Sequence, residues 1–179
     1  MPSTIDATVG GVDANSYATL AEATAYFGDR LHKGSWDGAS SSEKTAALLW
    51  AARVIDSRIE WIGNRTASTQ AMSWPRAYVP DPDPSYLPDD SLYGYLASDA
   101  IPSDIKHAQF EMALALIAGD VTVQPGATGL NSLAVGSLKL DFSGNTQQPS
   151  TFPRQVDELI CKYGVVRVTK SASRKLVRT

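Results

Sequence analysis

Apolar residues in the middle of the chain repeat with the spacing of one face of an α-helix. Their separations of 4, 3, 4 and 3 positions match the helical period. Ser40 and Glu43 form a capping box ahead of this stripe, and Gly63 is placed to end the helix after it. The pattern therefore predicts an amphipathic helix over 40–63. The stripe consists of Leu48, Ala52, Ile55, Ile59 and Ile62. Trp50 and Trp61 flank it, and we expect both in the core.

Three further helices are predicted from start signals and apolar periodicity. Thr19 and Glu22 form a capping box for a helix that runs to about residue 30. Ser103 is the expected cap of a helix that ends before Gly119. A fourth helix is predicted to start at Pro153 and to stop at 164.

Strand patterns are short and lie late in the sequence. Residues 138–142 alternate strictly between apolar and polar, which predicts a half-buried strand in a hairpin or long β-loop. Residues 165–169 form another β-prone segment, for which the sequence offers no partner. The fold class expected is mainly α: a small bundle of about four helices with a β-excursion and an extended C-terminal tail.

These patterns suggest one folded unit with appendages. Residues 1–15 are polar and aperiodic, and 77–100 is rich in Pro and Asp. The expected organisation is an N-terminal arm (1–15), a helical domain (16–164) containing excursions at 77–100 and 121–150, and a basic tail (165–179).

Charge is distributed unevenly along the chain. From Lys162 onward there are six basic residues and no acidic residue, whereas the first 161 residues hold 10 basic and 19 acidic residues, a net charge of −9. A basic segment attached to an acidic body is typical of a segment that binds a partner.

The residues that would indicate catalysis or metal binding are sparse. Only two histidines are present, and His107 pairs only with Glu111 at helical spacing, so no metal is predicted. Phosphate-binding glycine loops and nucleophile motifs are absent from the sequence, so we expect no enzyme and no cofactor. Asp56 is predicted to lie on a solvated helix face with Glu60, and the single Cys161 to be a buried apolar residue.

Two stretches carry a resemblance to a known family. One is 16–27, with the sequence SYATLAEATAYF. The other runs from Glu43 through Trp61 to Trp74-Pro75-Arg76. Together they resemble the head–tail adaptor (connector) proteins of tailed bacteriophages, grouped in a DnaT-like or head completion family. The likeness covers roughly 15–118, and the 80–92 excursion is longer than the family pattern.

This resemblance implies a structural virion protein in the neck of the particle, assembled in the host cytoplasm. It would form a ring of about twelve copies between the portal protein and a stopper or tail-completion protein, and double-stranded DNA would pass through it. An acidic wall would let DNA slide. No membrane contact is expected. Trp74, Pro75 and Arg76 would fix a turn, with the arginine bridging carboxylates or carbonyls. The residues expected to bind the portal are Val165, Val166, Arg167, Val168, Lys170, Arg174, Lys175 and Arg178.

The alternative is a DnaT-like single-stranded DNA-binding protein. Such a protein would need basic residues interleaved with exposed aromatic side chains. The basic tail has no aromatic residue after Tyr163, and the tryptophans are expected in acidic or neutral surroundings. The sequence therefore favours the adaptor hypothesis over this one.

Overall fold

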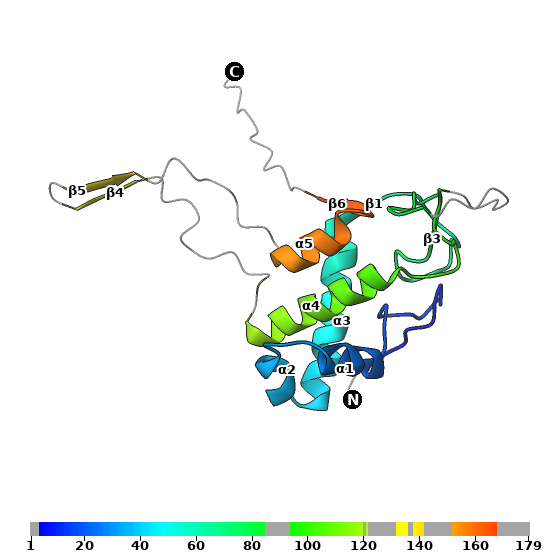
Figure 1. Cartoon of the computed structure of the whole chain (residues 1–179), viewed down its shortest axis with the longest axis horizontal. Coiled ribbons are helices and arrows are strands. Elements are labelled where there is room, and N and C mark those ends of the chain that lie inside the picture. Colours follow the sequence, from blue (N-terminus) through cyan, green and yellow to red (C-terminus); the bar gives the residue numbers. More distant parts are fainter. Residues whose placement is uncertain are drawn as a thin grey trace, which may run out of the picture.

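Two long helices, α3 (Ser41–Arg58) and α4 (Ser103–Ala118), pack side by side at the centre of the protein. A computed structural model describes residues 4–84, 94–119, 121, 132–135, 138–141 and 152–167. In Figure 1, α5 (Arg154–Ile160) lies along α4. The helices α1 (Leu20–Gly28) and α2 (Gly34–Gly38) lie near the N-terminal part of α3 and also contact α4. The predicted mainly α class is confirmed for the described residues.

The helix starts follow the local sequence signals. Thr19 Oγ1 accepts the backbone N–H of Glu22 at 3.2 Å, and Ser40 Oγ accepts that of Glu43 at 3.3 Å, so both capping boxes form. The helix α4 begins at Ser103, directly after Pro102, and no side chain caps it, so the expectation that Ser103 is its cap is wrong. The two capping boxes satisfy backbone donors that have no partner inside the helix.

The central helix is shorter than predicted, because it ends at Arg58 rather than near Ile62. Residues Ile59–Trp61 leave the helix and form strand β1. Ile59 stays fully buried, whereas Ile62 is 40% exposed. The apolar periodicity of the sequence continues beyond Arg58, but the backbone there forms hydrogen bonds with a distant strand in place of the next helical turn.

That distant strand is β6 (Gly164–Val166), which pairs antiparallel with β1 and aligns Ile59 with Val166. A Cβ at Gly164 would lie 2.6 Å from Ile59 Cγ2, so only glycine lets the two strands approach. The prediction of an unpaired C-terminal strand is wrong, because Val165 and Val166 belong to this sheet.

Two other small sheets complete the described structure. β2 (Asn64–Arg65) pairs with β3 (Arg76–Ala77), and β4 (Ser132–Val135) pairs with β5 (Leu138–Asp141), both antiparallel. The second pair lies where the alternation predicted a hairpin. The remainder of 121–150, apart from Val121, is outside the described residues, as is 85–93 of the Pro/Asp-rich excursion.

The core lies between α3 and α4 and continues under α1 and α2. Leu48 and Ile55 of α3 meet the buried face of α4, and Phe27 packs against Trp36 with ring centroids 4.4 Å apart. Two expectations about burial are wrong: Trp50 faces outward, and Cys161 lies exposed just after α5. The buried members of α4 are Ile105, Ala108, Gln109, Phe110, Glu111, Met112 and Ala113.

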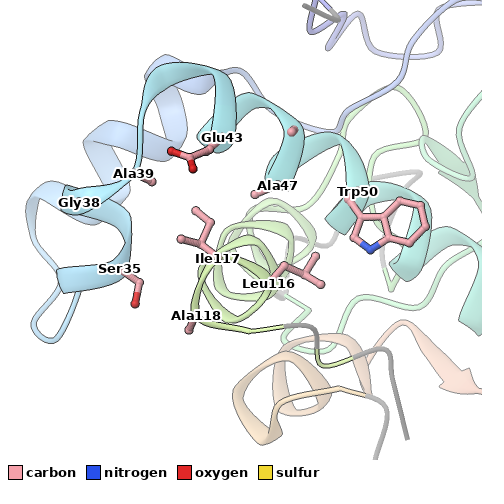
Figure 2. Close-up of a pocket in the computed structure, with 10 residues that line it drawn as sticks. Ser35, Gly38, Ala39, Glu43, Ala47, Trp50, Leu116, Ile117 and Ala118 are labelled. Carbon is pink, nitrogen blue, oxygen red and sulfur yellow. The ribbon is translucent and has the colours of Figure 1, made fainter.

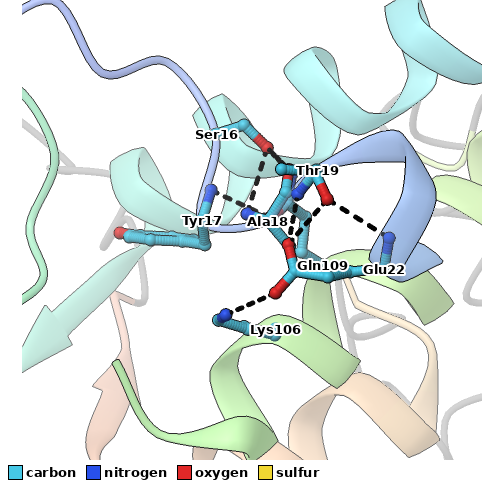
Figure 3. Close-up of polar contacts among 7 residues, drawn as sticks. All are labelled: Ser16, Tyr17, Ala18, Thr19, Glu22, Lys106 and Gln109. Atoms are coloured by element: carbon cyan, nitrogen blue, oxygen red, sulfur yellow. Dashed lines mark hydrogen bonds and ion pairs between the residues drawn. The ribbon is translucent and has the colours of Figure 1, made fainter. Parts of the chain in front are cut away.

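A polar group inside this core ties the N-terminal segment to both long helices. Gln109 donates from Nε2 to Ser16 Oγ at 2.7 Å and to the Leu48 carbonyl at 2.9 Å, and its Oε1 accepts the N–H of Tyr17 at 3.1 Å. Figure 3 shows this cluster beside the capping box of α1 and the Lys106–Glu22 ion pair. Satisfying every polar atom removes the cost of burying the amide.

Candidate nucleic-acid interface

The Trp-Pro-Arg motif lies inside the protein. Trp74 is 1% exposed. The Arg76 guanidinium donates to the carbonyls of Ile62 (2.7 Å), Ser73 (3.2 Å) and Gly63. The motif joins the loop before β3 to the turn after β1, and its arginine therefore has few donors left for a ligand.

Asp56 also belongs to this internal network. Its carboxylate accepts the backbone N–H of Ser73 at 3.0 Å and the hydroxyl of Tyr17. Burial raises the pKa of Asp56 above its usual range, although both hydrogen bonds oppose that shift. The expectation that Asp56 and Glu60 share a solvated face is wrong for Asp56, because the folded-back loop covers it; Glu60 is exposed.

The outer face of α3 carries a different combination of an aromatic ring and basic groups. Trp50 is 47% exposed, and Arg53, Ser57 and Arg58 follow it at helical spacings that keep all four on one side. They line a shallow pocket of about 300 Å³ together with Val54. The expectation that the tryptophans have acidic or neutral surroundings is wrong for Trp50, because two arginines line the same pocket.

The sheet formed by β1 and β6 brings further positive charge to the end of this face. The backbone N–H of Arg167 donates to the carbonyl of Arg58 at 2.7 Å, directly after β6. Arg167 is exposed, and the basic C-terminal sequence continues from it. Of the other expected tail residues, Val165 and Val166 lie in β6. Outside the described residues are Val168, Lys170, Arg174, Lys175 and Arg178.

On the other side of Trp50, an open groove of about 680 Å³ lies between α2, α3 and the C-terminal end of α4. In Figure 2, Leu116 and Ile117 project from α4 toward the face of α3 that carries Ala47 and Trp50. Small and apolar residues make up most of its described lining, in which Glu43 is the one charged residue. The lining residues are Ser35, Gly38, Ala39, Glu43, Ala46, Ala47, Trp50, Leu116, Ile117 and Ala118.

This site was not predicted from the sequence, because none of its residues belongs to a motif that indicates DNA binding. Trp50 was assigned to the core by its proximity to the apolar stripe, yet it lies two positions from Leu48 and Ala52, which places it about 200° around the helix from each. That angular offset was the available signal. No sequence pattern indicated that Arg58 lies beside Arg167, because their proximity depends on the pairing of β1 with β6, which are far apart in the chain.

Other chemistry finds little support in the described parts of the chain. No cluster of three or more His, Cys, Asp or Glu residues that could hold a metal ion occurs there. Among these residues, no helix has the length and apolar character needed to cross a membrane. The candidate site consists of the exposed Trp50 indole and the arginine side chains that line the same pocket.

The comparison with protein families agrees with this kind of site. A family described as "Putative DnaT-like ssDNA binding protein" matches residues 1–179, and the chain belongs to that family. No curated protein and no solved structure matches the chain.

This match corrects the adaptor interpretation. The family found is described by single-stranded DNA binding, and no head–tail adaptor family is found. The assignments of an adaptor role, a portal partner, a dodecameric ring and a stopper are therefore wrong. The residues that suggested the adaptor belong to the helical framework of this protein: the two capping boxes and the buried Trp-Pro-Arg loop stabilise the fold whatever it binds.

Proposed function

We propose that the protein is a non-enzymatic single-stranded DNA-binding protein, and that the outer face of α3 contacts the strand. The observation that carries this proposal is the exposed indole of Trp50 in one pocket with Arg53 and Arg58. Single-stranded nucleic acid is bound by this combination, because any base can stack on an aromatic ring while cationic groups attract the phosphates.

The charge distribution supports the same surface. Arg53 is exposed and makes no ion pair among the described residues, so its guanidinium is available to a phosphate oxygen. Arg167 extends the positive charge beyond Arg58, and the basic sequence after it adds to the local attraction for a polyanion. The acidic body beyond this face disfavours DNA elsewhere.

The test is fluorescence anisotropy of a labelled oligothymidylate titrated with the protein and with Trp50→Ala. Loss of one stacked base weakens binding by about 1–3 kcal/mol, or roughly 5- to 150-fold. The matched control is Tyr95→Ala, since Tyr95 is also about half exposed but lies beside the acidic Asp81 segment. We expect the control to bind like the unaltered protein. Equal affinities for all three proteins would refute the assignment to α3.

A further inference from the structure

We infer that the groove beside Trp50 takes unpaired nucleobases, and that it makes binding selective for single strands over duplexes. This inference rests on the proposed function and specifies how the strand is seated. The groove shares Trp50 with the basic pocket, so a base stacked on the indole has its neighbour at the groove entrance. Its volume of about 680 Å³ is within the range of pockets that hold small organic ligands.

The lining of the groove suits the faces of bases and not the sugar–phosphate backbone. Ala46 and Ala47 of α3 line the groove together with Leu116 and Ile117 of α4, and these apolar side chains offer no donor to a phosphate. Among the described residues that line it, Glu43 is the one charged group, and it is negative. A phosphate placed in this groove would lose hydration and would find only the Ser35 hydroxyl and the Trp50 indole N–H as donors among the lining side chains, whereas an aromatic base would bury apolar area.

The charges along α3 separate the positions of phosphates from those of bases. Arg58 lies eight residues after Trp50 and Glu43 seven residues before it, which at 1.5 Å per residue is about 12 Å and about 10 Å along the axis. Hydrogen bonds from the Ser40 hydroxyl and backbone N–H lower the pKa of Glu43, so its carboxylate is ionised at neutral pH. Phosphates are attracted at the arginine end and repelled at the Glu43 end, while bases enter the groove between them.

Duplex DNA cannot use this arrangement. Its bases are stacked and paired inside the helix, so their faces are not free to enter a groove of this size. A duplex can contact the arginines through its phosphates, but its bases can neither stack on the Trp50 indole nor contact the apolar lining of the groove. We therefore expect selectivity for single strands to depend on the groove, and attraction to phosphate to depend on the arginines.

The experiment compares an oligothymidylate with an abasic oligonucleotide of the same length and charge, each titrated by fluorescence anisotropy. Ala46→Leu fills the groove from an exposed helix position with a good helix former. Its matched control is Ala25→Leu, the same change at an exposed position of α1 outside the groove. We expect Ala46→Leu to weaken binding of the oligothymidylate by about tenfold, as for a lost base contact, and to leave binding of the abasic strand unchanged.

A second variant tests the charged end of the groove. Glu43→Gln removes the negative charge and keeps a residue that completes a capping box. We expect it to tighten binding of both strands by about two- to fivefold, since an exposed charge interaction is worth up to about 1 kcal/mol. Glu22→Gln, the same change in the capping box of α1 outside the groove, is the control and should alter affinity less.

The outcomes separate this inference from the proposed function. If Trp50→Ala weakens binding but Ala46→Leu behaves like Ala25→Leu, DNA binding stands and the groove inference is wrong. If the unaltered protein binds neither strand, both fail. If Ala46→Leu leaves DNA affinity intact and instead changes the mass measured by light scattering, the groove joins two copies of the chain, and the inference is overturned.

Discussion

The Trp-Pro-Arg loop and the outer face of α3 contain the same residue types in opposite settings. Trp74 is 1% exposed and Trp50 is 47% exposed. Arg76 donates to backbone carbonyls, whereas Arg53 has no ion-pair partner among the described residues. A tryptophan and an arginine thus stabilise the fold in one region and present a stacking and cationic surface in the other. The difference shows that burial and hydrogen-bond satisfaction, and not residue type, decide which role each plays.

The strongest way to break this comparison is to truncate both tryptophans. Trp74→Ala should lower the free energy of unfolding by about 3–5 kcal/mol, because it removes a buried ring that packs edge-on against Trp61 and Tyr163. Trp50→Ala should change it by less than about 0.5 kcal/mol. Urea unfolding followed by circular dichroism measures both. Similar losses of stability would mean that Trp50 is a core residue and that the contrast is mistaken.

The internal polar network offers a smaller effect of the same kind. Gln109→Leu leaves the buried N–H of Tyr17 without its acceptor, and should cost about 1–3 kcal/mol of unfolding free energy. Gln155→Leu on the exposed side of α5 is the control and should cost less than about 0.5 kcal/mol. Chemical denaturation of the two variants decides between them, and equal midpoints would contradict the assigned role of Gln109.

On the α3 side, the comparison is sharpened by salt dependence. Arg53→Gln should remove one phosphate contact, so the slope of log affinity against log salt concentration should become shallower by about 0.7. The control is Arg154→Gln, an exposed arginine on α5 whose guanidinium pairs with Glu158 at 2.8 Å. Anisotropy titrations at several salt concentrations give both slopes. An unchanged slope for Arg53→Gln would remove this arginine from the interface.

The smallest expected effect is a pH dependence of stability at α1. The hydrogen bond from Lys106, together with that from the Thr19 N–H, lowers the pKa of Glu22 from 4.5 to about 2. A lowered pKa means that the carboxylate stabilises the fold above pH 4.5 and that this contribution is lost as the pH falls through about 2. Because the side chain is 43% exposed, the contribution should stay below about 1 kcal/mol.

This prediction is checked with Glu22→Gln, which keeps the capping box and removes the ion pair with Lys106. Urea midpoints of the two proteins should differ slightly at neutral pH and converge as the pH falls below 4.5. A difference that grows toward low pH would show that the sign assigned to this group is wrong.

Much of the framework follows from short-range sequence signals. The capping boxes at Thr19 and Ser40 start α1 and α3, and Pro102 and Pro153 precede α4 and α5. These signals work because they concern backbone groups within one helical turn, so no distant contact is needed to satisfy them. Helix ends were predicted less accurately, because an end can depend on a distant segment. The helix α3 ends at Arg58 because the residues after it pair with β6.

The candidate site was much less accessible from sequence. The charge pattern located a basic C-terminal segment, and the family resemblance included DnaT-like DNA binding as the less favoured alternative. What was missing was an exposed aromatic side chain near basic groups. Trp50 provides it. Its offset from the apolar stripe of α3 was a signal for exposure, but only the packing of α4 against the opposite face of α3 establishes that exposure.

The sequence by itself determined the helical class, the starts of α1, α3, α4 and α5, and the asymmetry of charge, because helical period, helix-start signals and charge can be read from the residues themselves. The short helix α2 was not predicted. Only the tertiary structure decided that Asp56 and Arg76 are internal, that Trp50 is exposed, and that Arg167 lies beside Arg58. The physical reason is that burial and strand pairing arise from contacts between segments far apart in the chain. Gly164 shows this dependence: its lack of a side chain matters only because β1 lies against it.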